Sequence, residues 1–209
     1  MVRFIKAGLI RKISIPKPPS LRKGKRVMKK LVKLFVVSIL MYTGTAIYAQ
    51  NDPMVGGAAM FPTKNIVENA LNSNDHTTLV AAVKAAGLVD TLEGPGPFTV
   101  FAPTNEAFAK LPEGTVDNLL KPENLDTLKK VLTYHVVSGR ITTHDLKKMI
   151  ADGGGTATLT TVEGGSLWVM WKDGKFWIKD DKGGMATITI ANVYQSNGVI
   201  QVIDTVLMP

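Results

Sequence analysis

The sequence predicts an α+β fold, with helices in the first half of the globular part and a β-sheet in its last third. Between residues 63 and 134, apolar residues recur at helical spacing, whereas from residue 156 onward they alternate or gather in short β-branched runs. The helical spacing of apolar residues is first interrupted at 97–102, where the sequence Pro-Phe-Thr-Val-Phe-Ala predicts a short strand that ends at Pro103. Helices and strands segregated in this way favour an α+β architecture.

The first 49 residues differ in charge from the rest of the chain. They hold 12 of the 25 Lys and Arg residues and none of the 17 acidic residues, so residues 50–209 carry (25 − 12) − 17 = −4. The basic character therefore belongs to the leader. Because the remainder is mildly acidic and has no clustered Lys/Arg run, we expect no nucleic-acid partner.

The leader has the order of a secretory signal peptide. Residues 28–49 contain a basic start, an apolar run and an Ala-Ile-Tyr-Ala segment, which predicts cleavage after Ala49 and a secreted or periplasmic product. The apolar core, about 15 residues, is shorter than the roughly 20 that span a bilayer, so no integral span is expected after cleavage. Residues 1–27 are interpreted as a basic extension, with Met28 a candidate start of translation.

Catalytic and metal-binding patterns are weak. The absence of cysteine excludes a disulfide framework, a thiolate metal site and a cysteine nucleophile. His76, His135 and His144 are isolated, and neither a nucleophile elbow nor a phosphate-binding loop occurs. We therefore expect no catalytic residue, no metal and no cofactor, and the chain is not predicted to be an enzyme.

The first elements are predicted from caps and helical spacing. Residues 50–62 mix Pro, Gly and small residues and are interpreted as a flexible lead-in, with order beginning near Thr63. Thr63 is a candidate cap for a helix at 63–71. A second helix is expected at 77–86, capped by one of its first two threonines and ended by Gly87.

The segment 99–108, TVFAPTNEAF, reads as a strand, a cap and a helix. Thr104 or Asn105 can accept a backbone N–H at the start of the next helix. Glu106 would place negative charge near the positive end of that helix, and Phe108 would point into the core. We therefore expect this segment to have a structural role.

A third predicted helix is followed directly by a Tyr-His pair. Pro122 is expected to open a helix whose apolar face spans 125–132, followed by Tyr134 and His135. One interpretation packs both rings at a corner between helix and strand, with backbone partners for the phenol and imidazole. The other makes both residues part of an adhesion surface.

The last third is predicted to be mostly β-structure. Thr142 or Thr143 can cap a short helix that ends before Gly153. Asp173-Gly174 is a strong hairpin signal, and Asn197-Gly198 marks a further turn. The expected strands are 156–162, 166–171, 175–178, 185–191 and 199–207.

Tryptophan is concentrated on the predicted hairpin. Trp168 and Trp171 should lie on opposite faces because their spacing is odd, so at least one can be exposed. Such an aromatic edge could stack on sugars or add a partner strand, whereas the alternative is packing against the core.

Two segments carry a family resemblance. TVFAPTNEAF at 99–108 and SNGVIQVIDTVLMP at 196–209, with LTYHVV at 132–137 between them, resemble the signatures of the fasciclin (FAS1) domain family. The resemblance covers 63–209 and implies a FAS1 fold, a β-wedge or sandwich of about seven strands with several packed helices in its N-terminal half. The residues interpreted as structural parts of these motifs are Thr99, Phe101, Pro103, Thr104, Asn105, Phe108, Asn197, Gly198, Gln201 and Asp204.

The chain departs from the family pattern at two positions. Gln201 stands where the family usually carries His, so a site that titrates near neutral pH is not implied. Asn192 stands where the integrin-associated motif of some animal members would have Asp, which weakens any inference of integrin binding.

The resemblance implies an exported binding module for cell adhesion or for surface and matrix association. The expected partner is a cell-surface protein or glycan, and the candidate binding residues are Tyr134, His135, Trp168 and Trp171. The alternative function is a periplasmic carrier of a small molecule or lipid, held in a groove beside the sheet. An enlarged apolar cavity would favour the carrier, and an exposed aromatic patch would favour adhesion.

Overall fold

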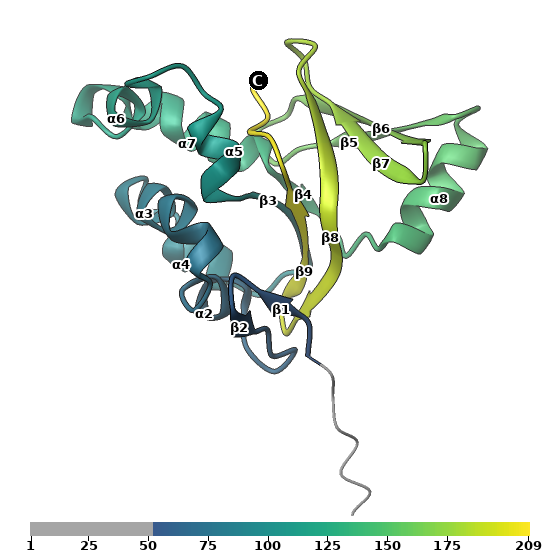
Figure 1. Ribbon diagram of the computed structural model, residues 1–209, viewed down its shortest axis with the longest axis horizontal. Coiled ribbons are helices and arrows are strands. Elements are labelled where there is room, and N and C mark those ends of the chain that lie inside the picture. Colours follow the sequence, from purple (N-terminus) through teal and green to yellow (C-terminus); the bar gives the residue numbers. More distant parts are fainter. Residues whose placement is uncertain (1–51) are drawn as a thin grey trace, which may run out of the picture. The chain divides into compact units, whose positions relative to one another are not determined.

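The computed structural model describes residues 52–209 (Figure 1). The predicted basic extension at 1–27 and signal peptide at 28–49 lie outside the described residues. Within 52–209, no helix combines the length and the apolar character needed to cross a membrane.

Seven strands form one strongly bent sheet in the order β4-β3-β9-β8-β7-β6-β5. β3 and β9 pair in parallel and every other neighbouring pair is antiparallel. The edge strands meet through a bridge between Val137 and Thr161, which closes the sheet into a wedge and confirms the predicted α+β class. The strands are β3 (Phe98–Pro103), β4 (Val136–Ser138), β5 (Thr156–Thr160), β6 (Ser166–Lys172), β7 (Lys175–Lys179), β8 (Met185–Gln195) and β9 (Gly198–Ile203).

Helices cover two separate parts of this sheet (Figure 1). Six of them lie on one side of β3 and β9, whereas α8 packs beside β5 and β6. The helices are α2 (Ile66–Ala70), α3 (Thr77–Ala85), α4 (Val89–Glu93), α5 (Asn105–Ala109), α6 (Thr115–Leu119), α7 (Leu125–Tyr134) and α8 (Thr143–Asp152). Short 3₁₀ turns, η1 (Asn74–His76) and η2 (Pro122–Asn124), precede α3 and α7.

The central strands are buried on both faces. Val100 and Ile200 belong to a core shared with the helices, whereas Phe101 and Ile203 belong to a second core inside the wedge. All six residues of β9 are therefore buried. This explains why the final signature segment reads as a nearly continuous apolar run rather than as an alternating strand.

The prediction that order begins near Thr63 is wrong. β1 (Met54–Val55) and β2 (Ala58–Ala59) form a small hairpin, and Val55 and Met60 are buried in the helix-side core. The segment is held by Asn69, whose side-chain amide exchanges hydrogen bonds of 3.0 and 2.8 Å with the Phe61 backbone. Strands of two residues are too short to give a periodic signal in the sequence.

Two of the predicted helix caps are also different. Asn65 rather than Thr63 caps α2, in a capping box with Glu68. No side chain of η1 or α3 caps α3; instead Asn105 Oδ1, 27 residues further along the chain, accepts from Thr78 N at 3.0 Å. Thr104 caps α5, as one of the two predicted alternatives.

The C-terminal strands follow the predicted order with shifted ends. Asp173 and Gly174 have φ of 53° and 74°, as expected for the predicted two-residue hairpin. β8 continues four residues beyond the predicted end, through irregular pairing and a positive φ at Asn192. β9 stops at Ile203, because Asp204 turns away to contact Thr187.

Replacing Asn105 should destabilise the junction between α5 and α3. Its side chain accepts from Thr78 N and donates to Asn74 O and Thr77 Oγ1 at 2.9 and 3.0 Å. We expect Asn105→Ala to lower the free energy of unfolding by about 1–2 kcal/mol in urea denaturation. Asn105→Asp, which keeps an acceptor for Thr78 N, should lose less. An unchanged free energy for the alanine variant would contradict this structural role.

Candidate functional site

Tyr134 lies entirely in the interior of the wedge. Its side chain has no exposed surface, and its hydroxyl donates to Ser166 O at 2.7 Å while accepting from Asp181 N at 3.0 Å. Burial raises the pKa of Tyr134 to about 12. The phenol therefore joins the end of α7 to β6 and to the loop after β7.

His135 is buried next to it, with 3% of its surface exposed. Nδ1 lies 2.7 Å from Val131 O, which can only accept, and Nε2 accepts from Leu207 N at 3.0 Å. The two partners together require a neutral ring with its proton on Nδ1. Burial lowers the pKa of His135 to about 4, so the ring is uncharged at neutral pH.

The Tyr-His corner thus holds other segments in place. Phe101 N donates to His135 O at 2.9 Å, and Met208 N donates to Asp180 Oδ2 at 2.9 Å beside the Leu207 contact. Both rings occupy the packed position described by the first interpretation. Neither presents an aromatic surface to solvent, and ligand contact by either residue stays a prediction.

Asn197 and Gly198 join the β8–β9 turn to the helices. Asn197 Oδ1 accepts from Ile66 N at 3.0 Å, and Nδ2 donates to Leu92 O at 2.7 Å. A Cβ at Gly198 would lie 2.2 Å from Phe98 O, so the close pairing of β9 with β3 requires glycine.

Asp204 fixes the chain where β9 ends. Its carboxylate accepts from Thr187 N at 2.7 Å and from Thr187 Oγ1 at 2.6 Å, and Lys110 Nζ donates to its backbone oxygen. Burial alone would raise the pKa of Asp204, but the hydrogen bonds from Thr187 outweigh it and the pKa is lowered. The carboxylate therefore has a local structural partner.

The remaining motif residues belong to β3 and the turn after it. Thr99 Oγ1 donates to Gly139 O at 2.6 Å and accepts from Ile141 N at 2.8 Å, which fixes the segment before α8. Phe101 and Pro103 are buried, Phe108 packs against the helix-side core, and half-buried Thr104 caps α5.

Gln201 and Asn192, the two departures from the family pattern, contact each other. Gln201 is fully buried; its Oε1 accepts from Asn192 N at 2.9 Å and its Nε2 donates to Asn192 Oδ1 at 3.1 Å. Asn192 Oδ1 also accepts from Thr143 N at 2.9 Å, at the start of α8. This network joins β9, the irregular part of β8 and α8. The sequence predicted the hydrogen-bonding capacity of Gln201 but not its partner.

The two candidate tryptophans lie on opposite faces of β6, as their spacing predicts. Trp171 shares the face of buried Val169, packs edge-to-face on Phe176 at 4.5 Å, and is 43% exposed. Lys147 Nζ of α8 lies 4.5 Å from the centre of its ring. Trp168 points to the other side, which we call the outer face of β5–β7.

The outer face of β5–β7 is a cross-strand array. Trp168 lies between Thr158 and Lys179, and the next row contains Thr156, Met170 and Trp177. A shallow hollow of about 280 Å³ is lined by Thr156, Trp168, Met170 and Lys179. Met170, Trp177 and Lys179 were not predicted as members of this site, although alternation along β6 and β7 places them on one face with Trp168.

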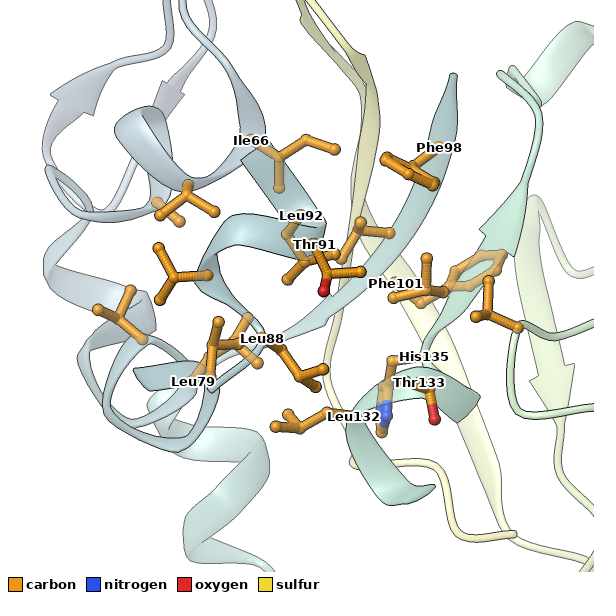
Figure 2. Close-up of a pocket in the computed structure, with 18 of the residues that line it drawn as sticks. Ile66, Leu79, Leu88, Thr91, Leu92, Phe98, Phe101, Leu132, Thr133 and His135 are labelled. Carbon is orange, nitrogen blue, oxygen red and sulfur yellow. The ribbon is translucent and has the colours of Figure 1, made fainter. Parts of the chain in front are cut away.

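An apolar cleft lies between the helices and β3 (Figure 2). Leu88, Leu92 and Leu132 point into it, with Phe98 and Phe101 on the side of the sheet. Its volume is about 70 Å³, well below the roughly 300–1,000 Å³ of typical small-molecule sites. The cleft is therefore not the enlarged cavity that the carrier interpretation requires.

The described residues contain no cluster of three or more His, Asp or Glu side chains that is placed to hold a metal ion. His76, also buried, contacts Ser73 Oγ through Nδ1 at 2.8 Å, and burial lowers the pKa of His76. Of the four candidate binding residues, only Trp168 and Trp171 are accessible to solvent, and Trp168 lines the hollow on the outer face of β5–β7.

Several known proteins are similar to this chain in sequence. The sequence model of the fasciclin domain matches residues 74–209. Protein sll1483 of Synechocystis is 49% identical over 160 residues, covering 77% of this chain and 82% of the relative. The cell surface glycolipoprotein MPB83 of Mycobacterium bovis is 34% identical over 176 residues, covering 81% and 72%.

A solved structure has the same fold. It is a FAS1 domain pair from the insect cell adhesion molecule Fasciclin I, with a TM-score of 0.63 and 20% sequence identity. The match covers 70% of this chain and 51% of that chain, so this chain spans about half of the insect pair.

Acid should destabilise the protein through His135. Its pKa is 6.5 in the unfolded chain and about 4 in the fold, so the unfolded state binds a proton first as pH falls. This contribution is fully present above pH 6.5 and is lost between pH 6.5 and 4, by roughly 3 kcal/mol. Urea denaturation across this range should show a smaller pH-dependent loss of unfolding free energy for His135→Gln. His144→Gln, at an exposed position of α8, should lose as much as the unsubstituted protein. Equal losses in all three proteins would contradict the neutral, buried ring.

Proposed function

The chain belongs to the fasciclin domain family, and on this basis we propose that it is an exported adhesion module. Members of this family are non-enzymatic domains of adhesion and surface association. It would associate with a cell surface or matrix through protein or glycan contacts. The relative named as a cell surface glycolipoprotein and the domain pair from a cell adhesion molecule support this assignment.

Export is supported by the composition of the leader. The basic start, apolar run and small-residue segment at 28–49 fit a secretory signal peptide. The first hairpin of the domain begins at Met54, a few residues beyond the proposed cleavage after Ala49. The exported product would therefore begin close to the folded domain.

The observation that carries the proposal is the open aromatic face of β5–β7. The hollow is lined only by residues of these strands, and Leu146 and Ile150 of α8 pack on the opposite side, in the wedge core. Trp168 and Met170 are thus half-buried side by side in this face, with part of each side chain open to solvent. Indole rings combine a large apolar surface with a polar N–H, a property that suits binding to proteins or sugars.

The apolar cleft supports a second candidate function. Its walls are almost wholly apolar, so a carrier of a small apolar molecule would place its ligand there. The volume of about 70 Å³ is small for a small-molecule site and favours the adhesion proposal instead.

Substitution of Trp168 tests the adhesion proposal. The chain, purified after export from a bacterial host, is applied to immobilised bacterial envelope material and to a glycan array. We expect Trp168→Ala to weaken retention about tenfold, whereas Trp171→Ala, on the opposite face of the same strand, should bind like the unsubstituted protein.

Equal retention of the Trp168→Ala protein would contradict the assignment of the outer face. A carrier would respond differently: Leu88→Trp, which fills the cleft, would abolish retention of a lipid extract, and Trp168→Ala would leave it unchanged.

A further inference from the structure

We infer that the outer face of β5–β7 binds an acidic polysaccharide, with indole rings stacked on sugar rings and lysines paired with sugar carboxylates. This inference rests on the proposed adhesion function and names the class of partner.

The charged side chains on the outer face of β5–β7 are all lysines. Strands β5, β6 and β7 contain three lysines and no acidic residue, although residues 50–209 as a whole carry a net charge of −4. Lys172, Lys175 and Lys179 are exposed and share the outer face with Trp168 by strand alternation. The local charge is thus opposite to that of the domain and complementary to a polyanion.

Acidic groups lie at the margins of this face: Glu163 is in the turn between β5 and β6, and the Asp204 carboxylate accepts from Thr187 Oγ1 of β8, which pairs with Trp177. Asp173 is in the hairpin turn, and Asp181 is beyond β7, where its carboxylate faces Ser166 N at 3.4 Å. Asp180 is buried and its carboxylate accepts from the backbone N–H groups of Gly184 and Met208. None of these acidic residues lies within β5, β6 or β7.

The lysines bracket an aromatic strip. Three cross-strand pairs of β6 and β7 follow one another toward the hairpin turn. They are Trp168 with Lys179, Met170 with Trp177, and Lys172 with Lys175. Trp168 and Trp177 are diagonal neighbours, about 7–8 Å apart at this register. A glycan chain running along the strands would therefore pass over the half-buried rings of Trp168 and Trp177, with a cation at each end.

The size of the face favours a glycan over a folded protein. Five residues along the strands and three strands across give about 17 by 15 Å, or roughly 250 Å². A standard protein interface buries about 800 Å² on each partner. The array also contains Thr156 and Thr158, whose hydroxyl groups can form hydrogen bonds with sugars.

The test uses sodium alginate as the polyuronate, dextran as the neutral glycan and poly-L-glutamate as a polyanion without sugar rings. Binding to the exported chain is measured by calorimetry and tryptophan fluorescence. We expect alginate to bind and dextran not to bind, with the alginate affinity falling as salt rises. Trp168→Ala should weaken alginate binding about tenfold and Lys179→Gln up to about fivefold.

Matched controls separate this face from general charge and folding effects. Trp171→Ala on the opposite face of β6, and Lys130→Gln at an exposed position of α7, should retain alginate affinity. Lys179→Glu gives a second test if Trp168→Ala does not fold, because charge reversal should lower affinity more than Lys179→Gln.

Three outcomes would overturn the inference. They are equal binding of dextran and alginate, poly-L-glutamate binding as tight as alginate binding, and alginate binding that is indifferent to both positions. If any of them occurs while Trp168→Ala still weakens envelope adhesion, the acidic-glycan class is wrong and the adhesion proposal stands. If envelope adhesion is unchanged as well, the proposed function fails too.

Discussion

The fold depends on one buried, neutral imidazole. His135 can donate to Val131 O and accept from Leu207 N only in the uncharged state, and its own carbonyl accepts from Phe101 N. One residue therefore joins the end of α7, the central strand β3 and the C-terminal segment. A protonated, charged imidazole buried without a partner would raise the free energy of the folded state. The low dielectric of the interior therefore strengthens these hydrogen bonds and also keeps the ring neutral.

The residues that hold the fold together are different from those that we propose to bind a partner. The two signature segments form β3 and β9, whose faces are covered by the helices on one side and by the wedge core on the other. Their polar side chains, such as Asn197 and Asp204, are occupied by backbone partners. Our proposal therefore places recognition away from the signatures, on the outer face of β5–β7, where half-buried indole rings lie beside exposed lysines. The family resemblance identifies the fold, while the less distinctive hairpin carries the proposed binding surface.

Features encoded by neighbouring residues could be predicted from the sequence. The α+β class, the Thr104 cap and the Asp173-Gly174 hairpin depend on local spacing and turn chemistry. Contacts that join distant segments could not be predicted, because strand register and helix packing bring their residues together. Asn105 caps a helix that begins 28 residues earlier, and Gln201 pairs with Asn192 across two strands. The alignment of lysines with tryptophans depends in the same way on the pairing of β6 with β7.

The most direct test of this separation is hydroxyl-radical footprinting of the exported chain, free and bound to envelope material. Sulfur and indole side chains are readily oxidised, so Met170, Trp168 and Trp171 report on both faces of one strand. Our account predicts that binding protects Trp168 and Met170 while Trp171 is oxidised as in the free protein. Protection confined to the helical side, for example at exposed Leu71, with Trp168 unchanged, would contradict it.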